Sequence, residues 1–416
     1  MINDKIKQGL KKRYRSENIF RVSGLFAILI ALIFLLILFF AVIYRGAPAF
    51  ITHKIALEVD LSNHQSQEND EEVNYRQIVK NSLLANFPQT ENVEQKINLY
   101  NLLNNDAYLE LELEVKNHPD LLGNKIVFWF TSSSDVDMFL KGKILANTKE
   151  EDRIIKDDQI NWIKTLQAKN AIKSNFNWNF LKNADSSEAE IAGVAASITG
   201  SVLTIAIFLL ASFPIAVMAA FYLEEFASKN IITDIIEVSI NNLAAIPSII
   251  FGLLGLVVYL NFMHLPRSSS IVGGLTLSML VLPIIIIATR NAIKSIPTSI
   301  KEGAAAMGAS KVQIMFHHTF PLALPGIMTG TILAISRAVG ETAPLLMVGM
   351  VAFIADVPSG FKDPTTVMPV QIYLWSDNPE LGFAEKAAAA IMVLLFFLVS
   401  CNGIAIYIRK KFEKKW

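Results

Sequence analysis

The chain has 416 residues, of which 52% are hydrophobic and 18% are charged, and its apolar residues lie in long uninterrupted runs. This is the composition of a membrane protein. The formal net charge is zero, which identifies no partner, and because Cys401 is the single cysteine an internal disulfide is excluded.

The first predicted span occupies 22–44 and follows a basic tail at 1–21. Its uncharged run from Val22 to Ile43 is long enough, at about 1.5 Å per residue, to cross a hydrocarbon core of about 30 Å. The run also exceeds the roughly 7–15 apolar residues of a signal peptide. Although Ala47-Pro48-Ala49 resembles a cleavage site, we therefore expect a retained membrane anchor.

A polar insert at 45–190 follows the first span. Both chain ends are rich in lysine and arginine, so the positive-inside rule places the ends in the cytoplasm and the insert outside it. Alternating apolar and polar residues predict strands at 55–61 and 109–115, and helical spacing predicts helices over 72–87 and 150–172. We expect a small α+β domain, whose acidic, asparagine-rich character favours a solvated exterior over a ligand-binding surface.

Five further apolar runs bring the predicted spans to six, an even number that keeps both ends in the cytoplasm. We therefore expect an all-α polytopic membrane protein with an inserted α+β domain. Its core at 191–408 would hold the second to sixth transmembrane helices, and a basic cytoplasmic tail would follow at 409–416. The runs are Ile191–Tyr222, Val238–Phe262, Ile271–Thr289, Leu322–Ile354 and Ala387–Ile408.

A cytoplasmic link at 295–320 joins the fourth and fifth spans. Ser299 precedes Glu302 by three residues, which is the spacing of a helix capping box. Gly308 predicts a break, and Ser310 can begin a second helix. Two short helices joined at this glycine would form a compact cytoplasmic knob.

The link resembles the EAA signature of ABC importer permeases. That resemblance implies that the knob docks in a groove of a separate nucleotide-binding subunit and transmits its closure to the spans. The alternative is an ordinary amphipathic loop. The residues that match the signature are Glu302, Ala304, Gly308 and Pro321, and the departures are Gly303, His318 and Phe320.

Two charges, Arg337 and Glu341, lie deep inside the fifth predicted span. Each costs about 2.5–3.5 kcal/mol at a helix centre on insertion scales. Four residues apart on one helix they share a face, so an ion pair can reduce this cost while both face a protein-lined or wet cavity. Pro344 cannot donate to the Gly340 carbonyl, which predicts a kink or local opening beside the pair.

The same span suggests a path for an anion. The guanidinium of Arg337 offers planar donors to an oxyanion, and Glu341 would orient or neutralise it so that the anion can leave. Ser336 and Thr342 would add hydroxyl donors. The alternative is a purely structural ion pair. The residues assigned to helix packing in this region are Gly326, Gly330, Gly340 and Pro344.

The string RAVGETAPLL at 337–346 resembles the PstA family of phosphate ABC importer permeases, as do AFYLEEFA at 220–227 and AAIPSIIFGLLGL at 244–256. The resemblance extends through much of 191–416 and implies a type I ABC importer permease fold with six transmembrane helices. The insert at 45–190 departs from family members that have a short loop here, so its role stays open.

The resemblance also implies partners. These are a homologous permease subunit (PstC-like), ATPase subunits (PstB-like), an extracytoplasmic phosphate-binding protein (PstS-like), phosphate and the lipid bilayer of the bacterial inner (plasma) membrane. The chain itself has no Walker A loop, because Gly142-Lys143 has Asp137 five residues before the glycine and no Ser or Thr after the lysine. We expect it not to be an enzyme, to bind no cofactor, metal or nucleic acid, and to rely on ATP used by a partner.

Two alternatives remain open at this point. Arginine does not by itself distinguish phosphate from sulfate or molybdate, so the cargo can be another oxyanion. A membrane-anchored phosphate sensor is the alternative from a different class, although the five spans after the insert and the short cytoplasmic segments argue against it.

Overall fold

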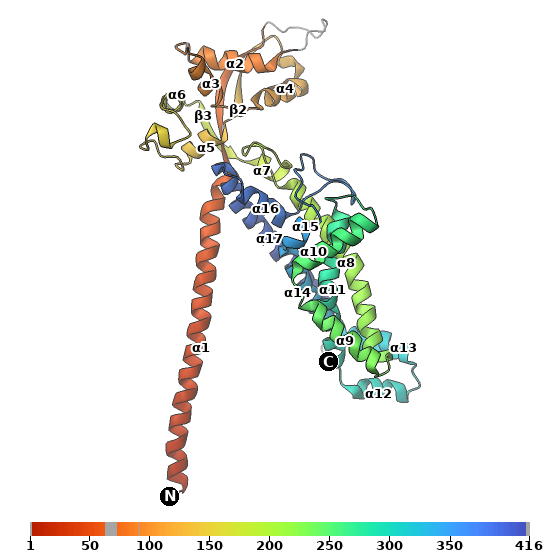
Figure 1. Cartoon of the computed structure of the whole chain (residues 1–416). Helices are drawn as coiled ribbons and strands as arrows, with labels where there is room; N and C mark the ends of the chain where they lie inside the picture. Colours follow the sequence, from red (N-terminus) through yellow and green to blue (C-terminus); the bar gives the residue numbers. More distant parts are fainter. Residues whose placement is uncertain (1, 63–72, 91, 413–416) are drawn as a thin grey trace.

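The computed structural model describes residues 2–62, 73–90 and 92–412. Figure 1 shows a small mixed domain at one end, a bundle of helices below it, and one long helix that stands apart from the bundle. Both chain ends lie away from the mixed domain. The helical core and the α+β insert expected from the sequence are therefore both present.

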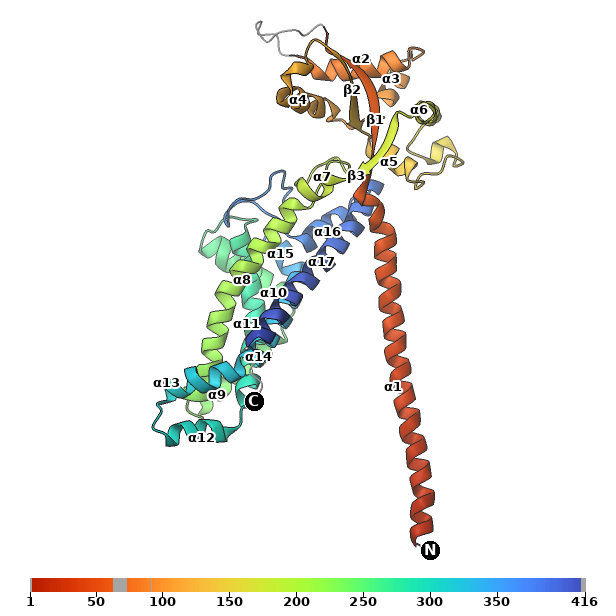
Figure 2. The ribbon, with the colours of Figure 1, turned by 180° about the vertical axis from the view of Figure 1, so that it is seen from behind.

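The first span is one continuous helix, α1 (Ile2–Gly46). The predicted tail at 1–21 is not a separate segment, because from Ile2 onward it is helical and continues into the apolar run. None of the apolar stretch of α1 is buried, and Figures 1 and 2 show the helix diverging from the bundle. It meets the bundle at Gly46, where a Cβ atom would lie 2.7 Å from the backbone of Ala388. Lipid or another subunit must therefore cover most of α1.

The insert contains a three-stranded antiparallel sheet in the order β2-β1-β3. The central strand β1 (Ile51–Asp60) confirms the strand predicted at 55–61. It pairs with β2 (Lys125–Thr131) and β3 (Ile172–Phe176), two strands that the sequence patterns do not predict. Alternate side chains of β1 enter the core of the insert, namely Ile55, Leu57 and Val59.

The strand predicted at 109–115 is wrong, because this segment lies in helix α4 (Ala107–Asn117). Leucine and glutamate alternate here, but both are strong helix formers. Burial follows the helical period instead: Leu111 and Val115, four residues apart, are buried, whereas Leu109 and Leu113 are exposed. Packing of one helical stripe against the sheet therefore overrides the apparent period of two.

The helix predicted at 72–87 is confirmed as α2 (Tyr75–Asn86), with residue 72 outside the described residues. The one predicted at 150–172 is shortened to α6 (Asp157–Ala168), because Asn170 takes a left-handed conformation (φ 54°) and the chain then enters β3. The other elements of this part are α3 (Val93–Tyr100), α5 (Ser134–Leu140), α7 (Trp178–Lys182) and 3₁₀ turns at Ala47–Phe50, Pro119–Leu121 and Glu150–Asp152.

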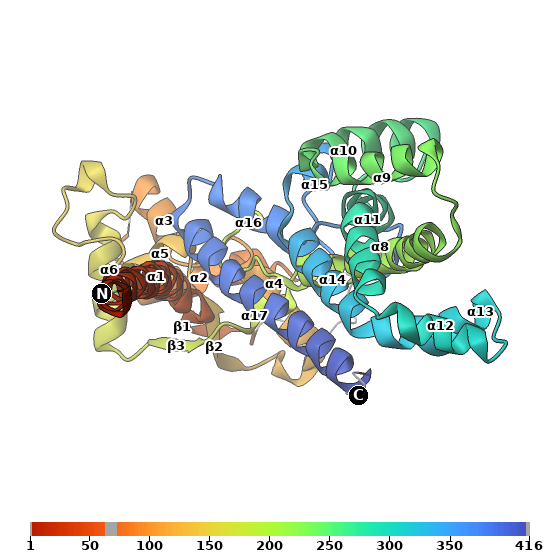
Figure 3. The ribbon, with the colours of Figure 1, turned by 90° about the horizontal axis from the view of Figure 1, so that it is seen from below.

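Four long helices form the bundle. Seen from below, α11 lies between α8 and α14 (Figure 3), and 61% of its apolar stretch is buried. Small residues allow this close approach: a Cβ atom on Gly326 would lie 2.6 Å from Cβ of Ala292, and one on Gly330 would overlap Ala288. The four helices are α8 (Ala195–Phe221), α11 (Ser270–Lys294), α14 (Phe320–Gly340) and α17 (Leu381–Phe412).

The third predicted span, 238–262, is not one straight helix. It consists of α9 (Ile231–Ala244) and α10 (Ser248–Gly255), the latter extended by π turns over Leu256–Phe262, and the two are bent by 102°. Pro247 lies at the break, where it has no N–H to continue the helical ladder. By length and composition, the described residues therefore hold five helices able to cross a membrane, or six if the bent pair is one span.

Candidate functional site

The knob predicted at 295–320 consists of α12 (Thr298–Ala306) and α13 (Lys311–Ile314), and it lies at the end of the bundle opposite the insert (Figure 1). Gly308 separates the two helices with φ +85°, a conformation that favours glycine. Of the four residues assigned to coupling, Glu302 and Gly308 are exposed and Ala304 is half-buried, while Pro321 lies in the first turn of α14.

The predicted capping box at Ser299 and Glu302 is wrong. Pro297 occupies the N-cap position of α12, so Ser299 already lies inside the helix. The capping box begins α13 instead: the Gln313 N–H donates to Ser310 Oγ, and the Ser310 N–H donates to Gln313 Oε1 at 2.8 Å. The N-cap residues of the two helices in the knob are therefore Pro297 for α12 and Ser310 for α13.

A chain of ion pairs ties the knob to the bundle. Lys301 of α12 contacts Glu225 at 2.5 Å, and Glu225 lies in a π turn, Tyr222–Phe226, that extends α8. The neighbouring Glu224 accepts from Arg290 Nε at 2.5 Å at the end of α11. Arg290 is 6% exposed and also pairs with Glu237 of α9. Lys294 lies 3.3 Å from Glu224.

These contacts connect α12 to the extension of α8, and that extension to the end of α11 and the middle of α9. The sequence patterns did not single out these charges. The sequence feature that could have indicated them is the adjacent pair Glu224 and Glu225 in the string AFYLEEFA at 220–227. Two carboxylates at the end of an apolar run need cationic partners. Figure 3 shows α12 and α13 extending beside α14 as one arm.

The predicted anion path centres on Arg337 and Glu341, which form an ion pair with Nε and Oε1 3.5 Å apart. The helix that carries them is not continuous, because α14 ends at Gly340 and Glu341 has extended backbone. Arg337 therefore lies in the last helical turn, with 43% of its side chain exposed, and Glu341 lies just beyond it. The pair sits beside a break in the span rather than in mid-helix.

Pro344 does not kink a continuous helix; it lies in the first turn of a new one, α15 (Ala343–Met347). Pro344 is buried, and its backbone packs against α10, since a Cβ atom on Gly252 would lie 2.7 Å from Pro344 Cα. The packing role expected for Gly340 is wrong, because a Cβ atom there would meet nothing within 4 Å. Gly340 is the last residue of α14, and no other segment of the described part of the chain packs closely against it.

The two hydroxyls assigned to the path differ in their positions. Ser336 donates to the Ile332 carbonyl at 2.9 Å and to Asn402 of α17 at 3.0 Å, so its hydroxyl faces a neighbouring helix rather than Arg337. The structure therefore removes Ser336 from the group around the arginine. Thr342 is half-buried at the N-cap of α15, directly after Glu341.

A second charged cluster joins the insert to the bundle. Lys141, the residue directly after α5, lies 2.6 Å from Asp137 and 2.6 Å from Glu385 near the start of α17, and each of these side chains is at most 10% exposed. His53 Nδ1 lies 2.8 Å from Asp137. Burial alone would raise the pKa of Asp137, but the contacts with His53 and Lys141 outweigh it and lower that pKa.

The same junction holds Glu190, whose pKa burial raises to about 8. Lys386, also buried, donates to the Ala192 carbonyl. The last span was predicted to begin at 387, but α17 begins at Leu381 and so carries Glu385 and Lys386 into its first turns. The sequence prediction missed Glu385 and Lys386 because it defined the span as a run of residues without charges. Among the described residues, no three metal-ligating side chains come together as a metal site.

Comparison with known proteins divides the chain in two. Residues 191–414 match the model of the binding-protein-dependent transport system inner membrane component family. Residues 7–150 match a family that is described as a domain of unknown function. The two matches leave 151–190 unmatched, a stretch that holds α6, β3 and α7 of the insert.

Individual relatives match slightly more than half of the chain. The phosphate transport system permease protein PstA of Haemophilus influenzae is 30% identical over 227 residues, which are 54% of this chain and 78% of that protein. A probable ABC transporter permease protein, YqgI of Bacillus subtilis, is 28% identical over 57% of this chain and 86% of its own length. The MetNI methionine ABC transporter, in an inward-facing structure, aligns with a TM-score of 0.42 at 19% identity over 53% of this chain and 97% of its own.

Proposed function

We propose that this chain, which belongs to the family of binding-protein-dependent transport system inner membrane components, is a permease subunit of an ATP-driven phosphate importer and forms half of the translocation path. The family match covers 191–414, the helical bundle and the knob. The likeness to PstA of Haemophilus influenzae supports phosphate as the cargo. The chain is a multi-pass protein of the inner membrane.

The observation that carries the choice of an anion is the position of Arg337. It lies about 26 Å along α14 from Phe320, at about 1.5 Å per residue, and thus far from the knob end of the helix. Because α14 stops three residues later, the guanidinium stands beside a break where backbone groups and water can also reach an ion. Glu341, 3.5 Å away, balances the charge so that a bound oxyanion is not held permanently.

One half cannot enclose this path. Arg337 and Leu333 are both exposed on α14, and one span with one ion pair cannot surround a hydrated anion. A homologous permease subunit is proposed to cover this face, with an extracytoplasmic phosphate-binding protein delivering the cargo. Both chain ends and the knob are proposed to be cytoplasmic, which agrees with their common position away from the insert (Figure 1).

Coupling to a separate ATPase subunit is proposed for the knob. Glu302 and Gly308 are exposed on it, and Lys301 on the same helix is anchored to Glu225. A rigid-body push on α12 would therefore reach α8 and, through Glu224, Arg290 at the end of α11. The anchoring contacts supply the mechanical link that the sequence resemblance implies.

The substrate test uses the complete transporter reconstituted in vesicles, with uptake of labelled phosphate energised by internal ATP. Arg337→Ala should abolish uptake while the subunits still co-purify, and Arg337→Lys should retain part of it because the charge stays but the planar donors are lost. Uptake that persists in Arg337→Ala would reduce the pair to a structural role. Excess unlabelled sulfate or molybdate should not compete; competition equal to that of phosphate would identify a different cargo.

The coupling test uses the same vesicles and measures ATP hydrolysis together with uptake. Glu302→Ala and Gly308→Ala should each lower uptake, the second because a left-handed conformation costs a non-glycine residue about 1–2 kcal/mol. Normal uptake and normal hydrolysis in both variants would rule out the coupling role. This result is independent of the substrate test, which concerns only Arg337.

A further inference from the structure

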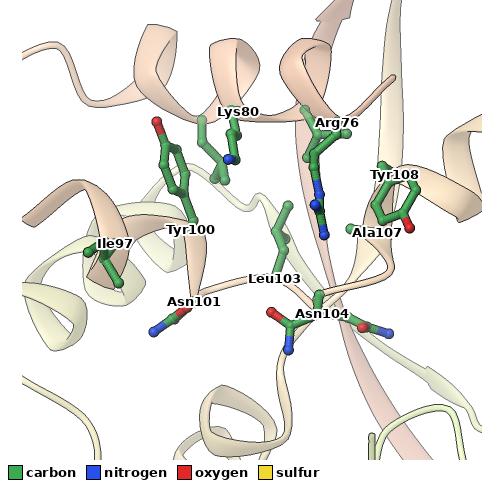
Figure 4. Close-up of a pocket in the computed structure, with 12 residues that line it drawn as sticks. Arg76, Lys80, Ile97, Tyr100, Asn101, Leu103, Asn104, Ala107 and Tyr108 are labelled. Atoms are coloured by element: carbon green, nitrogen blue, oxygen red, sulfur yellow. The ribbon is translucent and has the colours of Figure 1, made fainter. Parts of the chain in front are cut away.

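The insert contains a pocket that the transport function does not use. It has a volume of about 330 Å³ and lies between α2, α3 and α4, on the part of the molecule farthest from the knob. This volume lies within the range of small-molecule sites and exceeds what inorganic phosphate alone requires. Figure 4 shows the side chains that line it.

Two cations from one helix face project into this pocket. Arg76 and Lys80 are four residues apart on α2, and both descend between the rings of Tyr108 and Tyr100 (Figure 4). Cζ of Arg76 lies 5.0 Å from the centre of the Tyr108 ring, and Nζ of Lys80 lies 5.1 Å from that of Tyr100. Each cation is thus held over an aromatic face, which fixes its position without neutralising its charge.

No residue that lines the pocket is acidic, and all of them lie within the described part of the chain. Two like charges at this spacing on a helix repel each other by about 0.2–0.5 kcal/mol. An anion between Arg76 and Lys80 would remove this repulsion and accept hydrogen bonds from both.

A buried amide supplies a third donor. Asn104 is only 4% exposed, and its Oδ1 accepts from the Asp106 N–H at 2.8 Å, which fixes the orientation of the side chain. Asn104 is one of the residues that line the pocket, and its Nδ2 is buried without a hydrogen-bond partner among the described residues. A buried donor without a partner costs about 1–3 kcal/mol, so a ligand oxygen that accepts from it would recover this energy.

The rest of the wall combines the amides of Asn101 and Asn105 with aliphatic side chains. Most of these aliphatic side chains belong to the core of the insert, whereas Ile97 is exposed, and they offer nothing to a fully hydrated ion. A ligand that fills the site must therefore combine a charged head with an apolar body. The aliphatic lining residues are Val79, Leu83, Ile97, Leu103 and Ala107.

We propose that this pocket binds a small organic anion, with a phosphate or carboxylate head held by Arg76, Lys80 and Asn104 and an apolar body against the aliphatic wall. The insert is then a ligand-binding domain rather than only a solvated exterior. This inference does not depend on which ion the helical bundle transports, because no residue of the bundle lines the pocket.

The test uses the full chain in nanodiscs of zwitterionic lipid and titrates phenyl phosphate and benzoate by calorimetry, with inorganic phosphate and phenol for comparison. Phenyl phosphate should bind saturably and more tightly than inorganic phosphate, and phenol should not bind measurably. Arg76→Gln and Lys80→Gln should each weaken binding about tenfold or more, the usual worth of a charge-assisted hydrogen bond. Asn104→Asp, which keeps the acceptor for the Asp106 N–H, should weaken it further by adding a negative charge.

Two variants serve as controls. Lys182→Gln removes an exposed lysine that lies 5.4 Å from the Trp178 ring outside the pocket, and it should leave binding unchanged. Arg337→Ala should also leave it unchanged, which separates this site from the proposed transport path. The proposal would be overturned if Arg76→Gln and Lys80→Gln bound phenyl phosphate as tightly as the wild-type chain, or if the folded wild-type chain showed no saturable binding. Inorganic phosphate binding as tightly as phenyl phosphate would overturn the assignment to an organic anion.

Discussion

The junction between the insert and the bundle depends on Lys141, and replacing it with methionine tests how strongly. Lys141 lies 2.6 Å from both Asp137 and Glu385 in a buried setting. In Lys141→Met, Asp137 keeps His53 at 2.8 Å, whereas Glu385 loses its cation. Two buried pairs are thus lost, but only Glu385 is left without a cation, and such an uncompensated buried charge costs about 3–5 kcal/mol.

This cost translates into a large thermal shift. At about 2–4 °C per kcal/mol for a unit of 150–250 residues, the unfolding midpoint should fall by roughly 6–20 °C. The assay is thermal unfolding of the full chain in detergent at pH 8 and pH 5. The loss should be larger at pH 8, because the unpaired buried carboxylate takes up a proton as the pH falls and its penalty then decreases.

Two further variants calibrate the result. Glu385→Gln leaves Asp137 and Lys141 as a neutral pair, so its loss should be smaller. Lys116→Met removes an exposed pair with Glu112, also four residues apart, and should cost less than about 1 kcal/mol. A loss in Lys141→Met no greater than that in Lys116→Met, or one that does not change with pH, would refute the reasoning.

Three other predictions concern separate contacts. Lys301→Glu should lower phosphate uptake per ATP hydrolysed, and the double variant with Glu225→Lys should restore it; no rescue would exclude this pair as the link. Because the folded pKa of Glu190 is about 8 against an ordinary 4.5, its burial lowers stability as the pH rises from about 4.5 to about 8. Glu190→Gln should therefore raise the unfolding midpoint at pH 8 but not at pH 4, and an equal effect at both would contradict this. Gly330→Leu, which would collide with Ala288, should prevent assembly of the bundle, seen as loss of folded chain in detergent.

The membrane architecture could be predicted from the sequence because long apolar runs have one main explanation. The insert was harder. The Leu-Glu alternation in α4 satisfies a strand pattern, and only the sheet packed against Leu111 and Val115 selects the helix. Strands β2 and β3 were not predicted, because they are stabilised by pairing with β1, which lies far from them in the chain, and a local sequence pattern does not show such pairing.

Breaks within the spans could be predicted only in part. Pro247 lies in the middle of a long apolar run and bends it by 102°, yet proline inside α8 at Pro214 leaves that helix continuous. The difference lies in what packs beside each residue, which the sequence does not state. The end of α14 at Gly340 likewise depends on α15 packing against α10, not on the proline at 344 alone.

The position of a charge along an apolar run decides whether the sequence reveals it as a site residue. Arg337 and Glu341 attracted attention because they interrupt an apolar run, and the structure relieves their cost by ending the helix there. Other buried charges, such as Arg290 and Glu385, lie where predicted spans end, so a run-based criterion treats them as boundaries. A charge at a helix end costs less to insert because partners from other segments and water can reach it.

It follows that the ends of the spans, rather than their centres, are where this chain concentrates its polar contacts. At the knob end, Glu224 and Glu225 connect α8 to α11 and α12, and at the opposite end Lys141 and Glu385 connect α5 to α17. Between these ends the bundle is held mainly by small residues and apolar packing, with the hydrogen bond between Ser336 and Asn402 joining α14 to α17. The proposed push on the knob would therefore reach the bundle through contacts at one end of its helices, and the insert is tied to the opposite end.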